Sequence, residues 1–476
     1  MMRIKLILLC SLLGLTACQY LLPQYKKPEN NLVPNNWSKE YQYQQLSQKN
    51  ISEQLWWQGF HNQELNHFID DALKLNSQLH VAEGILKESE ANLQRIKLTW
   101  LPTISADGTM YRGELLNVSN STQLGELFNS RWNKKTWPYS GYIGGITPSY
   151  TLNFFSKYNQ TSKAKWDFES KKQLYRSVRL AIISQTAMSY FNLIGFKEQL
   201  NITKQTIDDM ESQRKYMLIQ YQRGAISKIE LLNIEQRIAY LKKNIPKIRQ
   251  GIKLSENSLA FLTNRKIGTI QTTYSFKRIN TALIIPYNLP SQLIKQRPDV
   301  VAAEYELRKY NAQVAEAISE LLPTFNISLL MDNFGFFLGK FISTTTNLLF
   351  GQLSAAMPLI DGNIYGQIKR AKAVEYTSIY NYIGVVSMAI VDIDNAMSAR
   401  QNSKTILKYL QLSGMKARQQ YKLGSFQYQQ GAISYMDLLN YKSNVDVVAL
   451  KETQAKQQDV NAIVALYQAL AGGSCV

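Results

Sequence analysis

One cysteine stands in a sequence context that specifies its chemistry. Residues 15–18 read Leu-Thr-Ala-Cys, and they follow an apolar run and a start made basic by Arg3 and Lys5. This order is typical of a signal peptide cut by a lipoprotein signal peptidase, with an ordinary small-residue cleavage site as the alternative. We therefore expect residues 1–17 to be removed and Cys18 to be acylated on its sulfur and its amino group.

An acylated Cys18 anchors a chain firmly, since each buried methylene of an acyl chain contributes about 0.8 kcal/mol. Gln19 follows it, whereas an Asp there would resemble a signal for retention in the inner membrane of Gram-negative bacteria. The sequence thus favours lipid of the outer membrane. Cys475 is the only other cysteine left after cleavage, so we expect no disulfide within the mature chain.

No arrangement of residues predicts catalysis or a bound cofactor. His61, His67 and His80 have no set of cysteines beside them, and the spacing of the first two is not one that zinc sites use. The glycine motifs of phosphate sites, dinucleotide sites and nucleophile elbows do not occur. We expect a protein that is not an enzyme, with no metal, no cofactor and these histidines on the surface.

Basic residues outnumber acidic ones by 54 to 35, which gives a net charge of +19, or +17 once Arg3 and Lys5 are removed. The lysines are spread along helical stretches, as over residues 157–172, and no compact basic cluster with interleaved aromatics occurs. Nucleic acid is therefore not an expected partner. Solvated helix faces near an anionic surface are the better interpretation.

A thirteen-residue motif occurs twice and steps back from single residues to architecture. Residues 221–233 read YQRGAISKIELLN and residues 428–440 read YQQGAISYMDLLN, with nine identical positions at an offset of 207. Residues 82–103 match residues 303–324 at an offset of 221. Together the matches predict an internal duplication, with about fourteen extra residues in the first copy after residue 103.

Each copy of the motif has the features of a helix that ends, turns and begins again. A glycine suits the left-handed position after a helix, and a serine followed by an acid three residues later matches a capping box. We therefore predict two helical hairpins with tips at residues 224–227 and 431–434. The residues concerned are Gly224, Ser227 and Glu230 in the first copy and Gly431, Ser434 and Asp437 in the second.

Long helices and short strands are expected to lead to these tips. No proline lies between Pro148 and Pro246, so residues of about 160–222 predict one helix of about 90 Å, paired with neighbours as in a coiled coil. Four other segments alternate apolar and polar residues, the period of a strand between lipid and water. These strands are predicted at 103–112, 139–153, 324–336 and 345–358, with a polar loop at Gly113–Trp137.

Residues 341–360 carry no charge and offer a membrane helix as an alternative, but Gln352 and Pro358 favour a strand with its turn. Four strands cannot close a membrane barrel. An open edge in lipid leaves unpaired backbone groups, which cost several kcal/mol each. If the strands insert into a membrane, the chain must therefore form an oligomer.

Short segments in a fixed order run along nearly the whole mature chain. They are PQYKKP at 23–28, WWQGF at 56–60, ALKLN at 72–76, SYTLNFF at 149–155, RPDV at 297–300, PLIDG at 358–362 and ALYQALAGG at 465–473. With these segments the chain resembles outer-membrane efflux proteins of the TolC and OprM type, in the NodT-like lipoprotein branch. Asn153 departs from the Asp usual in that family. We interpret Arg297, Pro298 and Asp299 as the start of a helix, not as a site.

The resemblance implies an α+β membrane protein that assembles as a homotrimer. Each chain is expected to give four strands to an outer-membrane β-barrel and long helices to a periplasmic α-helical barrel. The implied divisions are an anchor and equatorial segment at 18–60, a first repeat at 61–270, an equatorial linker at 271–296 and a second repeat at 297–476. The implied function is a passive exit channel for drugs or toxic small molecules, working with a periplasmic adaptor and an inner-membrane transporter of the RND type.

The resemblance also assigns roles near the second tip. Asp437 takes the position of an acidic ring, in which three carboxylates favour cations, and helix capping alone is the alternative. Met436 takes the position of an apolar constriction. Asn440 stands where related channels often have Asp, which leaves a second acidic ring in doubt. We expect the tips to dock the adaptor, with turn chemistry alone as the alternative; the tip residues are Gly224, Ala225, Ile226, Ser227, Gly431, Ala432, Ile433 and Ser434.

Two other functions remain open at this stage. One is an exit duct for type I protein secretion, although the lipoprotein signal favours efflux because secretion ducts more often resemble the non-lipidated branch. The other is a periplasmic coiled-coil lipoprotein with a structural role and no pore. It would leave residues 103–153 and 324–358 outside the membrane.

Overall fold

The computed structural model describes residues 23, 25–28, 55–116, 136–279, 294–338, 340 and 342–471. Cys18, the predicted signal peptide and most of the loop at 113–137 lie outside the described residues. The chain forms two compact units. One contains residues 89–168 and 306–378, and the other lies within 27–88, 169–305 and 379–476.

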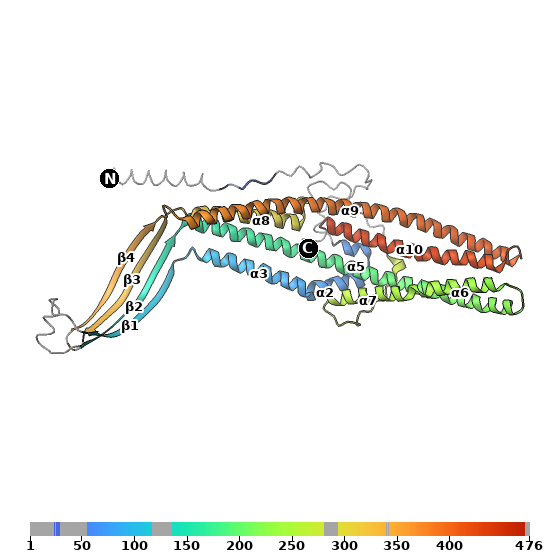
Figure 1. Ribbon diagram of the computed structural model, residues 1–476, viewed down its shortest axis with the longest axis horizontal. Helices are drawn as coiled ribbons and strands as arrows, with labels where there is room; N and C mark the ends of the chain where they lie inside the picture. Colours follow the sequence, from blue (N-terminus) through green and yellow to red (C-terminus); the bar gives the residue numbers. More distant parts are fainter. Residues whose placement is uncertain are drawn as a thin grey trace. The chain divides into compact units, whose positions relative to one another are not determined.

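The elements follow one another as two similar series (Figure 1). The first is η2 (Trp56–Phe60), α2 (Gln63–Leu75), α3 (Ser77–Leu98), β1 (Thr103–Leu116), β2 (Thr136–Leu152), α5 (Phe154–Gln222), α6 (Lys228–Lys242) and α7 (Asn244–Leu262). After η3 (Phe276–Arg278), the second is η4 (Ile294–Gln296), α8 (Pro298–Ser319), β3 (Thr324–Leu338), β4 (Ile342–Ala356), α9 (Gly362–Gln429) and α10 (Tyr435–Ala469). None of the described helices is long and apolar enough to cross a membrane.

The duplication seen in the sequence governs the packing as well. Helix α8 begins and ends 221 residues after α3, and α10 ends 207 residues after α7. In the unit that contains the sheet, two buried clusters repeat at the same offsets, so one packing arrangement has been used twice. The first cluster holds Leu93, Ile96 and Ala164, and the second holds Val314, Ala317 and Ala371.

One difference between the copies has a covalent cause. The first copy returns from its tip as two helices, α6 and α7, whereas the second returns as the single helix α10. Pro246 lies at the start of α7 and has no N–H to donate to the carbonyl of Lys242, where α6 ends. The equivalent position in α10 is Thr453, whose N–H is intact, and that helix is continuous.

The four strands form one antiparallel sheet in the order β1-β2-β3-β4, side by side in Figure 1. The register puts polar and apolar residues on opposite faces. One transverse row on the polar face holds Thr103, Ser149, Ser328 and Gln352. A row on the apolar face holds Ala106, Ile146, Met331 and Leu349.

The strands differ from the predicted ranges only at their ends. Strands β1, β2 and β3 extend by two to four residues towards the hairpin loops, because cross-strand pairing continues there to Leu116↔Thr136 and Leu338↔Ile342. Strand β4 begins at Ile342 instead of 345 and ends at Ala356, before Pro358. A proline offers no N–H to a strand ladder, which explains why the pairing stops short of it.

Glycines in the sheet make room for tyrosine rings. At Gly141 an added Cβ would lie 2.4 Å from the ring of Tyr111, the residue directly across the ladder. The same arrangement recurs in two further direct pairs, and an aromatic ring over a glycine of the neighbouring strand helps to fix the register. These pairs are Tyr139 with Gly113 and Tyr142 with Gly335.

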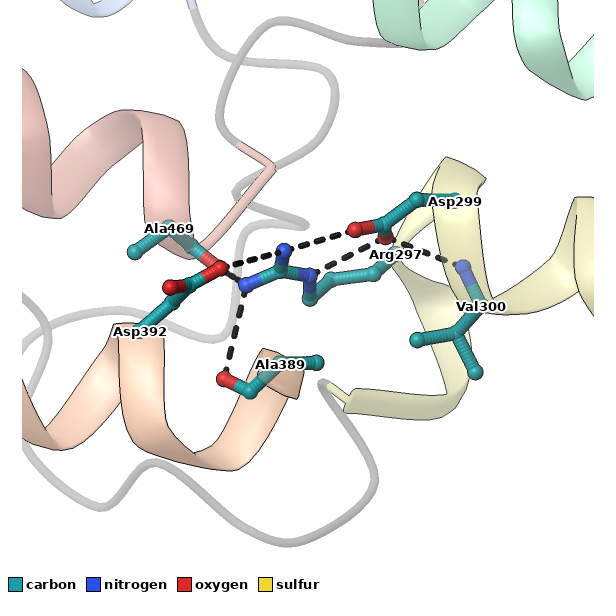
Figure 2. A network of polar contacts seen from close by, with 6 residues as sticks. All are labelled: Arg297, Asp299, Val300, Ala389, Asp392 and Ala469. Carbon is teal, nitrogen blue, oxygen red and sulfur yellow. Dashed lines mark hydrogen bonds and ion pairs between the residues drawn. The ribbon is translucent and has the colours of Figure 1, made fainter. Parts of the chain in front are cut away.

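In the other unit, Arg297 joins three helices where α8 begins (Figure 2). Its guanidinium donates to the carbonyl oxygens of Ala389 on α9 and Ala469 at the end of α10, at 3.5 and 3.1 Å. It also contacts the carboxylates of Asp299 and Asp392 at 2.7 and 3.3 Å. Burial would lower the pKa of Arg297, but the hydrogen bond and charge of Asp299, with those of Asp392, raise it.

The first copy solves the same problem with a different residue. Asn76 lies 221 residues before Arg297, and its side-chain amide donates to the carbonyl of Leu262, the last residue of α7, at 2.9 Å. Leu262 lies 207 residues before Ala469. The Asn76 carbonyl oxygen also accepts from the backbone N–H of Leu79, which caps α3. In both copies, therefore, a side chain at the start of one helix holds the end carbonyl of the returning helix.

We expect Arg297→Ala to lower the free energy of unfolding by about 2 kcal/mol, because the buried carbonyl of Ala469 and two carboxylates lose their partner. Thermal denaturation of the purified protein followed by circular dichroism would measure this. The matched control is Arg370→Ala on the exposed side of α9, which we expect to change stability by less than about 0.5 kcal/mol. Equal effects of the two substitutions would contradict the role given to Arg297.

Candidate functional site at the two helical tips

Both tips close by the same backbone hydrogen bonds. In the first, the N–H of Ala225 donates to the carbonyl of Gln220 and that of Gly224 to Tyr221, both at 2.9 Å. In the second, Ala432 and Gly431 repeat these bonds to residues 427 and 428 at the same distances. This is the Schellman arrangement, and it places each glycine in the left-handed region, with φ of 71° at Gly224 and 69° at Gly431.

The next helix begins at each tip with a complete capping box, as the motif predicts. The Ser227 hydroxyl accepts from the N–H of Glu230, and the Glu230 carboxylate accepts from the N–H of Ser227 at 2.9 Å. At the second tip, the hydroxyl of Ser434 accepts from the N–H of Asp437 at 3.1 Å. One carboxylate oxygen of Asp437, Oδ2, accepts both from the N–H and from the hydroxyl of Ser434.

Asp437 therefore caps a helix and still faces solvent. Its side chain is exposed, and the bonds that cap α10 all use Oδ2, which leaves Oδ1 turned towards water. Capping and an electrostatic role at a pore are thus compatible in one residue. The acidic ring itself needs other copies of the chain and stays a prediction.

An apolar cluster beneath the tips joins the two hairpins. It contains Met210 and Met217 of α5, three buried residues of α6, and Leu439 of α10. Met436 is half-buried and packs against this cluster, with Ile226 and Tyr435. The α6 members are Leu231, Ile234 and Ile238. Met436 thus has a packing role in the single chain, and its predicted role at a constriction is untested.

Polar contacts cross the same seam. The guanidinium of Arg237 on α6 donates to the side-chain oxygen of Asn440 on α10 at 3.0 Å. Lys442 on α10 lies 3.3 Å from Asp209 on α5 and 2.8 Å from Asp446. Burial alone would lower the pKa of Lys442, but its contacts with these two carboxylates raise it.

Sequence analysis missed these contacts across the seam. The pair Lys442 and Asp446 has the spacing of neighbours on one helix face and was visible in the sequence. Arg237 and Asn440 are 203 residues apart, and Asp209 is as remote from Lys442. The duplication brings the two motifs together in space, but it does not say which side chains meet.

The remaining tip residues suit a docking surface without proving one. Gly224, Ala225 and Ser227 are exposed at the first tip, and Gly431, Ala432 and Ser434 at the second. Ile226 and Ile433 are half-buried. Both tips therefore present small side chains and open backbone to a partner.

The predicted surface histidines do not form a site. His67 lies 3.6 Å from Asp71, and His80 lies 3.5 Å from Glu83, each within one helix. His61 follows η2 with a φ of 49°. Within the described part of the chain, no group of three or more His, Cys, Asp or Glu side chains is placed to hold a metal ion.

Comparisons with known proteins agree with this geometry. The sequence profile described as outer membrane efflux protein matches residues 68–265 and 289–472. The probable outer membrane lipoprotein SilC of Salmonella typhimurium is 24% identical over 99% of this chain and 99% of its own. The cation efflux system protein CusC of Escherichia coli is 24% identical over 98% of each chain.

Solved structures show the same fold. The structure of the outer-membrane channel OprN has a TM-score of 0.76 at 18% identity, and covers 95% of this chain and 99% of that one. A structure of CusC has a TM-score of 0.75 at 20% identity, and covers 95% and 100%. The TolC-like fold predicted from the sequence, with four strands and long helical hairpins, is thereby confirmed.

We expect Gly431→Ala to loosen the second tip, because an alanine at a φ of 69° costs about 1 kcal/mol. Hydrogen exchange followed by mass spectrometry of peptides over residues 425–440 should quicken about fivefold. The control is Gly384→Ala, inside α9, where an added Cβ meets no atom within 4 Å. That substitution should leave exchange at the tip unchanged, and a tip that responds to neither would contradict the left-handed cap.

Proposed function

Because the chain belongs to the family of outer membrane efflux proteins, we propose that it is the passive exit channel of an efflux pump in a bacterial outer membrane. One observation carries the proposal: the sheet has a polar and an apolar face, and its strands have 14 to 17 residues. Strands of about 9–11 residues suffice to cross a membrane. Such a sheet suits a wall between lipid and water.

The pore is a homotrimer. Strands β1 and β4 end the sheet, and each has a ladder partner on one side only among the described residues. Pairing β1 of one chain with β4 of the next satisfies both edges and removes the cost of unpaired groups in lipid. Three copies give twelve strands, a number within the range of known membrane barrels.

Cys18 carries the lipid that holds each chain to the outer membrane of a Gram-negative cell. The sequence of residues 15–18 supports this, and the relative SilC is named a lipoprotein. The helical hairpins reach into the periplasm, and their tips dock a periplasmic adaptor. An inner-membrane transporter of the RND type supplies the energy, so the channel needs no nucleotide site of its own.

The solutes that pass are drugs or other toxic small molecules. The relative CusC is named for cation efflux, and three Asp437 carboxylates around one mouth would favour cations. Met436 and Asn440 line the same constriction next to that ring. A narrow acidic mouth therefore selects by charge, while choice between solutes is left to the transporter.

Ser149 and Tyr150 test whether the sheet lines a pore. Ser149 lies on the polar face, across from Ser328, and Tyr150 lies on the apolar face, across from Ile327. With Cys475 replaced by serine, we expect Ser149→Cys to react with a membrane-impermeant thiol reagent and Tyr150→Cys to be protected in intact outer membranes. Equal reactivity at both positions would support the structural lipoprotein without a pore.

Asp437→Asn keeps a side-chain oxygen for the cap but removes the charge. In planar bilayers we expect single-channel steps whose preference for cations over anions falls at least twofold, because a ring of three charges is lost. Glu230→Gln is the matched control, since it is the equivalent capping residue of the first tip and should leave selectivity unchanged. An identical response of the two variants would return Asp437 to capping alone.

A further inference from the structure

A cavity of about 520 Å³ lies between α5, α6 and α10, in the seam below the tips. Its lining runs along α10 from Ser443 to Gln454, which corresponds to about 16 Å of helix. Cavities of about 300–1,000 Å³ are typical of small-molecule sites. The cavity is thus long and narrow enough for an elongated organic molecule.

The floor of the cavity is apolar in effect. Thr203 and Thr206 of α5 are almost fully buried, and their hydroxyls donate to carbonyls of their own helix, at Gln199 and Ile202. Their hydrogen-bonding capacity as donors is therefore used, and their methyl groups contribute to an apolar lining. Other apolar side chains complete it: Met210, Leu241, Val447 and Leu450.

The ionic groups of the lining leave a positive surplus. Asp446 is the one acid among the lining residues, and it is already paired with Lys442 at 2.8 Å. Burial also raises the pKa of Asp446 more than Lys442 lowers it. Arg237 donates to the neutral amide of Asn440, and Lys451 has no carboxylate at ion-pair distance among the described residues.

We propose that this cavity binds an anionic amphiphile, with its apolar body along α5 and its negative group at Arg237 and Lys451. Charge complementarity selects this class, because two cations face the cavity and its acid is neutralised from within. Both cations lie on the exposed rim, Arg237 on α6 and Lys451 on α10, where a charged group keeps contact with water. A bound molecule therefore bridges the first hairpin and the second.

The proposal does not depend on transport, since binding is measured on the purified full-length protein. The probe is anilinonaphthalene sulfonate, an anionic amphiphile that fluoresces when it leaves water. Uncharged N-phenylnaphthylamine has the same aromatic body and serves as the neutral probe. We expect the anionic probe to saturate one site per chain and to bind more weakly as salt is added, whereas the neutral probe should be insensitive to salt.

Lys451→Glu should weaken binding of the anionic probe about fivefold and leave the neutral probe within about twofold, as for a partly exposed ion pair. The matched control is Lys404→Glu, an exposed position on α9 outside the cavity, which should change neither. Val447→Phe, at a rim position that is 43% exposed and tolerant of size, should weaken both probes by filling the cavity.

Three results would overturn the inference. Equal effects of Lys451→Glu and Lys404→Glu would remove the anionic specificity. Unchanged binding in Val447→Phe, with the fold intact by circular dichroism, would place the probe elsewhere. Absence of saturable binding to the assembled wild-type protein would mean that the cavity is closed or filled by another chain.

Discussion

Backbone groups that leave water must find hydrogen-bond partners, and this constraint explains more of the molecule than any single contact. In the sheet, β2 and β3 are paired on both sides, while β1 and β4 each keep an edge without a ladder partner among the described residues. In water such an edge is tolerable, but in lipid each unpaired group costs several kcal/mol. An oligomer is the physical consequence of placing this sheet in a membrane.

The same constraint acts at the helix ends. At both tips the last carbonyls are bound by Ala225 and Ala432 through Schellman bonds, and the first N–H groups are bound by capping serines. The returning helices end far from the tips, at Leu262 and Ala469, where Asn76 and Arg297 hold the carbonyls. The duplicated units kept this function while the residue that performs it changed from a neutral amide to a buried, ion-paired guanidinium.

The seam between the hairpins combines apolar packing with sparse, specific polar contacts. Met217 and Leu439 are buried there, and removing them from water stabilises the contact without specifying a register. Arg237 with Asn440, and Lys442 between Asp209 and Asp446, add the specificity. A seam held by a few polar contacts and bordered by a cavity is easier to open or to brace than a continuous core.

The sequence by itself determined the duplication, the four strands, and the tips with their glycines and capping boxes. These features depend on local rules: a period of two, a left-handed glycine, and a serine three residues before an acid. Strand ends were less certain, because pairing with the neighbouring strand decides where β4 begins and ends. Only the tertiary structure decided that Arg237 meets Asn440, that Arg297 holds the end of α10, and that a cavity with two unneutralised cations lies at the seam. These contacts join residues 92 to 203 positions apart, and no periodic pattern in one chain records which distant side chains meet.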